Sequence, residues 1–552
     1  MNKLKTIILF AAFALCTLCI QIFTAKAEAA IIMVDDLSAA GSPTTCSLSD
    51  AVNAANANTP TNGCLAGEPE PTIDVIQLSE GTYENTVLPD IAESVSVIGT
   101  GSGTANYTAN LSGITFSFMP NSLDGTSKHY SVRLVSNSAV QSRFSGITNG
   151  TLIIEQGDYS GISTTVEDTA VLQTTIYDSF VRAVSNDGIS INHTSTATQS
   201  STRIDSTEID GSTSFMAGIG HDSLGLDTVT VNDTSIRGTQ YGIVNHECPS
   251  SVTTLYIANS RIGDGGMEVG LHNVCGHAVI TNTTFSGITG TAIAAKTNHS
   301  SNPSTVEKSQ IDITNSTFYD ITPSIAPLYF VTSSSPSAKA GVITVYTDPL
   351  SNPSSGSTLR LRHTTFAENT LGLEASVSFN NSAEFAELTI QNNAFEGKAV
   401  QGNYVAQAQP TVSGNIATLS SASGIRQVQT LGLGTPSDNG GLRPIGITGR
   451  LGNVLTLRPK YPSPLIDGAS SIGVVSDQRG ETRALLGAYD VGAVETTLAE
   501  YIADGGVWGT SITQLYNTGR AALGTSIAAG CITAIAYFVR RYHSMKQYAL
   551  LR

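Results

Sequence analysis

The chain has 552 residues, of which 13% are charged, and its formal net charge is −16. The basic residues form no stripe, so the composition argues against a nucleic-acid partner. Gly is abundant, with 52 residues, and Ser, Thr and Asn are frequent, which favours short strands and turns over a charge-rich cytosolic enzyme. The sequence indicates no cofactor.

Residues 1–29 have the pattern of a secretory signal peptide. Lys3 and Lys5 form a charged start, residues 7–23 are largely apolar, and small residues flank position 28. We therefore expect export and removal of this segment. The alternative is a retained membrane anchor.

Residues 30–70 are predicted to form an N-terminal cap that contains a short helix at 46–58. Ser47 can cap the helix, and Leu48, Val52 and Ala55 lie on one face. Such a helix can close the open end of a solenoid, whose first coil would otherwise expose its core and its strand edges.

Residues 46–52 also carry a family resemblance. Cys46-Ser47-Leu48 and Asp50-Ala51-Val52 resemble the CSLREA motif of secreted bacterial right-handed β-helix proteins, although Ser49 stands where that family usually has Arg. The strand-like run 73–78 and the turn at 81–83 follow as they do in the family. The resemblance implies a right-handed parallel β-helix outside the cell.

Residues 71–430 are predicted to form that β-helix. Alternating apolar residues, small polar residues, a large apolar residue and a turn recur along the central part of the chain. Such a repeat indicates stacked coils, and alternation is typical of strands. The large apolar residues that mark the repeat are Tyr159, Phe180, Ile209, Ile236, Ile262, Phe285, Phe318, Phe366 and Phe395. We expect loops in the 330–357 region, within the long gap between Phe318 and Phe366, and a binding surface is plausible there.

Four cysteines outside the apolar ends predict disulfides. The local pairing joins Cys46 to Cys64 and Cys248 to Cys275. The second pair is separated by about one coil of the repeat, so its members can lie in adjacent coils. A zinc site is the weaker alternative because the chain has no CxxC motif.

Two groups of residues are candidates for catalysis or metal binding. The first comprises His221, Asp222, Asp227 and Asp233, which bracket a strand and could serve a polysaccharide lyase or hydrolase. The second comprises His246, Glu247, His272 and His277, of which the three histidines could stack on one wall and bind a metal. Ordinary surface histidines beside a disulfide are the competing explanation, and we assign neither a catalytic set nor a metal.

Residues 431–496 are predicted to form C-terminal rungs closed by a polar network. Its members are concentrated in a charge-poor chain: Asp467, Asp477, Arg479, Arg483, Asp490 and Glu495. Arginines can pair bidentately with carboxylates, which favours a structural network over a catalytic cluster. The runs 463–468, 477–480 and 487–495 resemble the choice-of-anchor Q domain that ends many surface β-helices, with Ala484 where Pro is common.

Residues 497–519 are predicted to be a spacer, and residues 520–552 a membrane helix with a basic cytoplasmic tail. The run 521–539 carries no charge and is about 28 Å long as a helix, enough to cross the hydrocarbon layer. Arg540 and Arg541 follow it, which favours a cytoplasmic C-terminus. A buried terminal helix is the alternative.

Together these features predict a non-enzymatic cell-surface protein for display and adhesion. We expect it to bind an extracellular carbohydrate or protein ligand on another surface, while the 521–539 run holds it in the membrane. The alternative is a polysaccharide lyase or glycoside hydrolase acting on an extracellular polysaccharide.

Overall fold

The computed structural model describes residues 29–506, except for residues 39–40, 85–87, 100–108, 113–114, 118–127, 134–141, 148–149, 156–157, 160, 167–171, 184–186, 194–198, 212–216, 224–225, 247–252, 275, 298–308, 325–339, 348–356, 371–374, 407, 420–422 and 438–453. The predicted signal segment lies outside this range, apart from its last residue, and so does the apolar run 521–539. Within the described range, no helix is long and apolar enough to cross a membrane.

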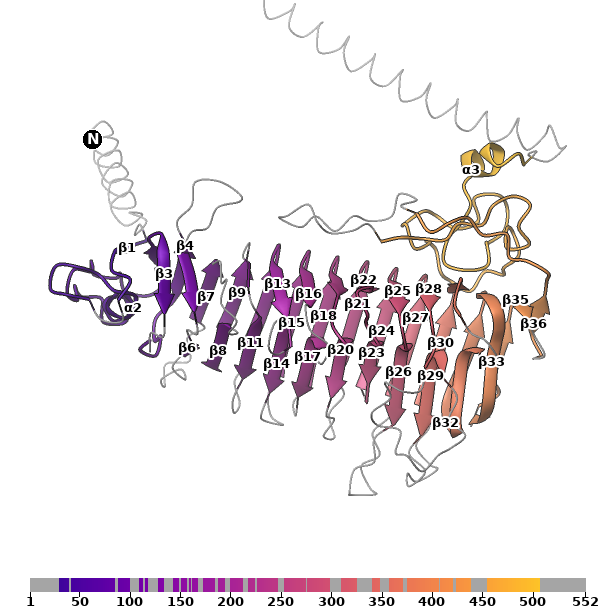
Figure 1. Cartoon of the computed structure of the whole chain (residues 1–552), viewed down its shortest axis with the longest axis horizontal. Coiled ribbons are helices and arrows are strands. Elements are labelled where there is room, and N and C mark those ends of the chain that lie inside the picture. Colours follow the sequence, from indigo (N-terminus) through magenta and orange to yellow (C-terminus); the bar gives the residue numbers. More distant parts are fainter. Residues whose placement is uncertain are drawn as a thin grey trace, which may run out of the picture. The chain divides into compact units, whose positions relative to one another are not determined.

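The strands form a parallel β-helix with three sheets, which we call A, B and C (Figure 1). Each coil passes from sheet A to B to C, and each strand pairs in parallel with the equivalent strand one coil later. Because every strand lies beside its counterpart in the next coil, the repeat seen in the sequence becomes a continuous ladder.

Sheet A contains β1 Ile31–Val34, β2 Asp74–Leu78, β4 Val95–Gly99, β7 Lys128–Arg133, β9 Gly150–Glu155, β12 Leu172–Tyr177, β15 Gln199–Asp205, β18 Leu226–Asn232, β21 Thr254–Ala258, β24 Gly276–Thr281, β27 Ser309–Thr314, β30 Ser357–Arg362, the end of β32 Ala375–Gln391, and β34 Thr411–Ser413. Sheet B contains β10 Asp158–Tyr159, β13 Phe180–Ala183, β16 Glu208–Gly211, β19 Ser235–Arg237, β22 Arg261–Gly263, β25 Thr284–Ile288, β28 Thr317–Ile321, β31 Thr365–Ala367, the start of β33 Ala394–Ala406, β35 Asn415–Leu419 and β36 Ile425–Gln427.

Sheet C contains β6 Thr115–Ser117, β8 Ser142–Ile147, β11 Ile162–Val166, β14 Ile189–His193, β17 Ala217–Ser223, β20 Tyr241–His246, β23 Val269–Asn273, β26 Thr291–Thr297, β29 Gly341–Thr347, the start of β32 and the end of β33. A separate pair joins β3 Gly81–Glu84 to β5 Ala109–Ser112. Strand β29 lies within the 330–357 region, which we expected to consist of loops, so this prediction is wrong for residues 341–347.

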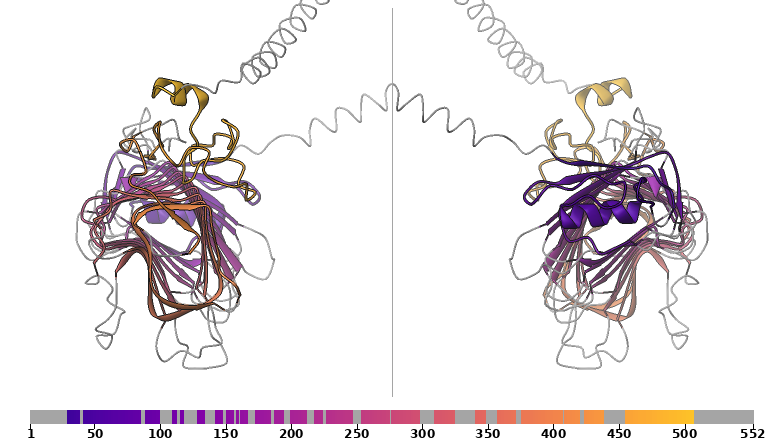
Figure 2. Two further views of the ribbon diagram at one scale, coloured as in Figure 1. Left: turned by 90° about the vertical axis from the view of Figure 1, so that its right-hand side faces the viewer. Right: turned by 90° about the vertical axis from the view of Figure 1, so that its left-hand side faces the viewer.

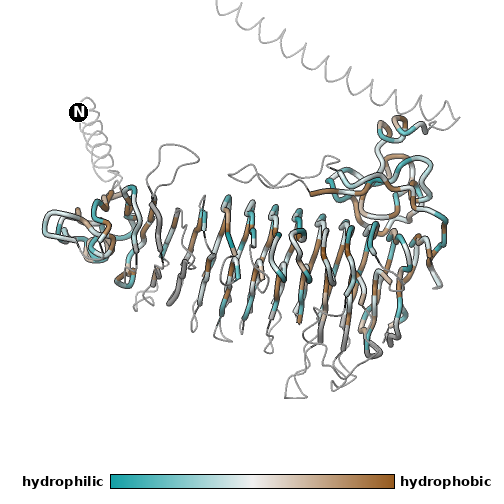
Figure 3. Tube along the Cα trace, viewed as in Figure 1, coloured by the Kyte–Doolittle hydropathy of each residue, from teal (hydrophilic) through white to brown (hydrophobic). Residues whose placement is uncertain are grey.

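The interior is an apolar column to which each coil contributes. Side chains alternate between buried and more exposed positions along the strands. Hydrophobic and hydrophilic residues are interspersed along the coils in the same region (Figure 3). In sheet B, the rings of Phe285, Phe318, Phe366 and Phe395 stack with centroid separations of 5.0, 4.9 and 5.0 Å. Identical residues one coil apart are thus stacked neighbours. Because these rings are fully buried, the stack is part of the core enclosed by the coils.

One marker residue of the repeat was wrong. Tyr159 pairs with Val181, and Val181 pairs with Ile209, so Val181 occupies the core position that we assigned to Phe180. Phe180 takes the preceding position, and the Arg182 guanidinium lies 5.1 Å from its ring centroid. Ring size misled the prediction, because the pairing register and not side-chain volume decides which residue enters the core.

The turn from sheet A to sheet B explains the small polar residues of the repeat. One residue per coil adopts a left-handed backbone there, which Asn and Asp tolerate better than most residues. These residues are Asp178, Ser206, Asp233, Asn259, Asn282, Asn315, His363 and Asn392, with φ between 47° and 58°. The hydroxyl of the next residue often donates back to the carbonyl two residues earlier, as Thr283 does to Thr281 at 2.9 Å.

Helix α2, Leu48–Ala57, covers the first coil (Figure 2, right). Ser47 is its N-cap and accepts a hydrogen bond from the Asp50 N–H. The apolar face of α2 joins the same core cluster as β1 and β2. Cys46 and Cys64 form a disulfide beside the helix, whereas Cys248 and Cys275 lie outside the described residues. The region predicted as a cap also supplies β1, which pairs with β2 as a strand of sheet A.

The structure divides into two units, residues 1–459 with 463–496, and residues 460–462 with 497–552. In the second unit, α3 spans Leu498–Ala503, where we expected a spacer. Thr497 and Glu500 form a reciprocal capping box, a sequence signal that the prediction overlooked. The described residues of 431–496 form isolated bridges and no named strand, so this segment does not add the further rungs we expected.

Candidate functional site

The first candidate group does not form one site. His221 and Asp222 are adjacent on β17, so their side chains leave opposite faces of the strand. His221 is buried and Asp222 is exposed. Asp227, on β18, is also buried, whereas Asp233 lies in the turn after β18 and accepts a hydrogen bond from Asn232 at 2.8 Å. The structure therefore brings together only His221 and Asp227, whose Nε2 and Oδ2 atoms are 3.3 Å apart.

His221 and Asp227 belong to a buried polar row that crosses several coils. His193 Nδ1 also contacts Asp227 Oδ2. On the other side, His221 Nδ1 lies 2.7 Å from Asn245 Oδ1, Asn245 donates to Asn273 at 2.8 Å, and Asn273 donates to the Ser309 hydroxyl at 2.9 Å. Each of these residues is at least 96% buried. A buried row of this kind fixes register and rigidity and offers no open position to a polymer substrate.

The second candidate group is divided between two sheets. His272 is buried on β23 of sheet C, whereas His277 lies on β24 of sheet A, so they do not stack on one wall as we expected. The side chain of His246 and residue Glu247 are outside the described part. Among the residues that the structure describes, no three His, Cys, Asp or Glu side chains are arranged to hold a metal.

A row of paired charges lies on the outer face of sheet A. His277 Nε2 is 2.9 Å from Asp312 Oδ2, and Arg360 bridges Asp312 at 3.2 Å and Glu387 at 2.5 Å. The hydrogen bonds from Arg360 hold the pKa of Glu387 below its usual value. Two carboxylates thus share one arginine, so this row is a cross-coil ion-pair ladder.

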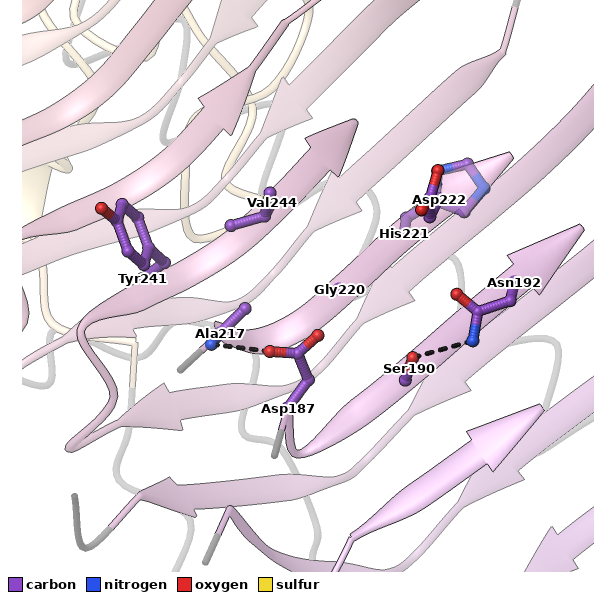
Figure 4. Close-up of a pocket in the computed structure, with 9 residues that line it drawn as sticks. All are labelled: Asp187, Ser190, Asn192, Ala217, Gly220, His221, Asp222, Tyr241 and Val244. Atoms are coloured by element: carbon purple, nitrogen blue, oxygen red, sulfur yellow. Dashed lines mark hydrogen bonds between the residues drawn. The ribbon is translucent and has the colours of Figure 1, made fainter. Parts of the chain in front are cut away.

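A pocket of about 270 Å³ opens on sheet C, over β14, β17 and β20 (Figure 4). Its lining residues are Asp187, Ser190, Asn192, Ala217, Gly220, His221, Asp222, Tyr241 and Val244. Ser190, Gly220 and Val244 occupy one register position in three adjacent coils, and Asn192 and Asp222 occupy the position two residues on. The pocket is therefore assembled from segments that are far apart in the sequence.

Asp187 shapes the floor of this pocket. Its Oδ1 accepts the Ala217 N–H at 3.0 Å (Figure 4). Its Oδ2 lies over Gly220, where an added Cβ would come within 2.1 Å of that oxygen. The missing side chain at Gly220 thus makes room for the carboxylate. Burial raises the pKa of Asp187 above its ordinary value.

Beside Asp187, the pocket presents groups that both donate and accept hydrogen bonds. Asn192 donates to the Ser190 hydroxyl at 3.0 Å, Asp222 is exposed at the rim, and the Tyr241 ring is half-buried. A concave site with a few polar groups and an aromatic side chain is typical of small-molecule binding. Sequence reasoning found Asp222 but missed Asp187, Asn192 and Tyr241, because only the register brings them together.

The predicted polar network lies in a segment that we call the strap, residues 463–496. Asp477 accepts the backbone N–H groups of Arg479 at 2.7 Å and Glu495 at 2.9 Å. Glu495 accepts the N–H groups of Ala484 at 2.8 Å and Asp490 at 2.9 Å. These side chains fold the strap back on itself through hydrogen bonds to its own backbone.

The strap runs along the turns between sheets A and B instead of closing the end of the helix. Gln478 bridges two coils, donating to Thr284 at 2.9 Å and accepting from Thr317 at 2.5 Å. Arg483 donates to Asn315 at 2.7 Å, and the Ala493 N–H donates to Thr365 at 2.9 Å. The network therefore holds the strap along the side of the β-helix, because its polar atoms form hydrogen bonds with the threonine and asparagine residues of successive coils.

Burial shifts the pKa values of several ionisable side chains in the strap. It raises the pKa of Asp490 to about 7, and nearby Glu495 adds to this effect. Burial likewise raises the pKa of Glu495 and lowers that of Arg483. Of the six network residues, Asp467 is the one not buried; its Oδ1 accepts the Ala488 N–H at 3.0 Å.

No family model and no curated protein sequence matches this chain. Among solved structures, the chain is similar to the one titled "Crystal structure of pectate lyase Pel9A", at 12% identity and a TM-score of 0.35. The match covers 86% of this chain and 98% of that chain. This similarity concerns the parallel β-helix fold, which the strand pairings establish directly, and carries no argument about activity.

Proposed function

We propose that this chain is a non-enzymatic β-helix that is displayed outside the cell and adheres by binding carbohydrate on a neighbouring surface. The observation that carries the proposal is the pocket on sheet C. Its aspartates, Asn192 and Tyr241 combine hydrogen-bonding groups with an aromatic face, which suits sugar hydroxyls and the apolar face of a sugar ring.

Binding is favoured over cleavage by the orientation of the candidate catalytic groups. The imidazole of His221 contacts Asn245 and Asp227 in the interior, and both partners are buried. General acid–base catalysis requires such a group within hydrogen-bonding reach of the substrate. Asp222 is exposed at the pocket, whereas the imidazole of its neighbour His221 is buried and occupied by these two contacts.

Display outside the cell rests on the sequence. The signal-like segment 1–29, the apolar run 521–539 and the basic residues that follow support export with a C-terminal membrane anchor. The CSLREA-like and choice-of-anchor Q-like motifs support membership among secreted bacterial surface β-helices of right-handed type. The disulfide between Cys46 and Cys64 suits an oxidising compartment.

The test combines location, binding and turnover. Protease treatment of intact cells that express the full chain should release fragments of the β-helix. The purified full chain should bind immobilised glycans and leave them intact, as measured by product analysis for unsaturated uronides and new reducing ends. Protection of the chain from external protease contradicts display. Release of sugar products that depends on Asp222 establishes the lyase or hydrolase alternative instead.

A further inference from the structure

We infer that the pocket over β14, β17 and β20 accepts one uncharged sugar unit of a neutral glycan and rejects uronate units. This inference rests on the proposed carbohydrate binding and specifies its ligand class. It follows from the charges, the size and the shape of the pocket.

The charges of the lining residues argue against an anionic ligand. Asp187 and Asp222 both line the pocket, and the nine lining residues include neither Arg nor Lys. A uronate carboxylate would enter beside two carboxyl groups and no arginine or lysine, whereas sites that recognise carboxylates use arginine forks or backbone N–H groups. The imidazole of His221 is held inside the coil by Asn245 and Asp227 and offers no compensating charge to the pocket.

The hydrogen-bonding groups match sugar hydroxyls. Carboxylate oxygens accept hydrogen bonds, and an amide or a hydroxyl both donates and accepts, so neighbouring hydroxyls of one ring can be bound from several sides. Asp222 at the rim and Asp187 at the floor provide acceptors, and Asn192 and Ser190 lie between them on β14. At the end of the pocket formed by β20, the Tyr241 ring supplies apolar surface for the C–H groups of a sugar (Figure 4).

The size of the pocket limits the ligand. About 270 Å³ lies just below the range of roughly 300–1,000 Å³ for small-molecule sites, so one sugar unit is expected to enter. Strands of adjacent coils lie about 4.8 Å apart, so the rest of the glycan can extend across the coils on the outer face of sheet C.

Gly220 allows the inference to be tested without removing a charge. A Cβ at this position would meet Asp187 Oδ2 at 2.1 Å, so Gly220→Ala should displace the carboxylate while keeping it in the chain. Gly220 is not among the glycines with a left-handed backbone, so alanine is compatible with its conformation. Asp222→Asn is the complementary change, because it keeps the size of an exposed side chain and removes its charge.

The experiment is titration calorimetry of the purified full chain. The probes are neutral gluco-, galacto-, manno- and xylo-oligosaccharides, matched in length with oligogalacturonates and oligomannuronates. At least one neutral series should bind, and the uronates should bind at least 10-fold more weakly. Asp222→Asn and Gly220→Ala should each weaken neutral binding at least 10-fold. Thr230→Ala, on the outer face of sheet A, is the control and should leave binding unchanged. Circular dichroism establishes that each variant is folded.

The possible failures are distinguishable. Uronate binding that is tighter than neutral binding and is lost in the pocket variants overturns the ligand class and leaves the proposed function standing. Neutral binding that persists in Asp222→Asn and in folded Gly220→Ala overturns the assignment to this pocket, again without touching the proposed function. If the full chain binds neither series, both the inference and carbohydrate binding fail.

Discussion

Replacing Gln478 by Ala should loosen the strap from the β-helix. Gln478 is 2% exposed, and its amide bridges Thr284 and Thr317 in adjacent coils. The substitution leaves the buried Thr317 hydroxyl without this acceptor, at a cost of about 1–3 kcal/mol. Thr284 still donates to the Leu455 carbonyl at 2.7 Å but loses an incoming hydrogen bond, which adds about 1 kcal/mol.

The sum, about 2–4 kcal/mol, predicts faster hydrogen exchange through opening of the strap by roughly 30- to 700-fold, since 1.4 kcal/mol corresponds to a factor of ten. Hydrogen-exchange mass spectrometry can follow the Gln478 N–H, which donates to Ala493, and the Gly492 N–H, which donates to Asn392. The exposed Gln427, whose amide donates to Thr418, provides the control variant Gln427→Ala.

The result that refutes this reasoning is equal exchange of residues 476–496 in wild type and Gln478→Ala. Acceleration of the same size in the control also refutes it. Exchange in the stacked strands of sheets A and C should change little in both variants, because the strap contacts the turns between sheets A and B. Uniform acceleration of exchange throughout the β-helix would mean that the strap stabilises the whole β-helix and does not open independently of it.

Three further predictions concern stability. Phe318→Ala should cost about 3–5 kcal/mol in chemical denaturation, because the ring stacks on both sides inside the core, and a loss below about 1 kcal/mol contradicts the stack. The raised pKa of Asp490 means that its contribution to stability is fully present below pH 3.8 and is lost as pH rises through about 7. Asp490→Asn should therefore flatten the decline in unfolding free energy between pH 4 and 7, and an unchanged profile in that variant argues against this assignment. Replacing Cys46 and Cys64 by Ser removes a link between residues 18 apart and should lower stability by about 3 kcal/mol, seen as a lower melting temperature; equal melting of the wild type and the double variant would show that the link does not stabilise the cap.

The sequence predicts the periodic features of this fold well. Alternating apolar residues, in a sequence repeat whose length corresponds to about one coil, indicate a parallel β-helix. A capped amphipathic segment indicates the helix that covers its first coil. These features are local or periodic, so they can be read without knowing which coils touch. Phe180 shows the limit, since only the register with Tyr159 and Ile209 assigns the core position to Val181.

The candidate site depends on contacts that the sequence does not show. His193 and Asp227 are 34 residues apart, and no motif joins them. Gly220 makes room for the Asp187 carboxylate, but in the sequence it is one glycine among many. The position of the strap also depends on such contacts. Clustered charges in the sequence predicted a polar network, but only the contacts with Thr284 and Thr317, which occupy one register position in adjacent coils, show where the strap lies.

The most direct test of the account is adhesion of intact cells that display the full chain. Cells carrying wild type and Asp222→Asn, matched for protease-accessible chain at the surface, are incubated with beads coated with the neutral glycan that binds in solution. The account predicts that wild-type cells attach and that Asp222→Asn reduces attachment at least 10-fold. Equal attachment of both, or a chain that external protease does not reach, contradicts it.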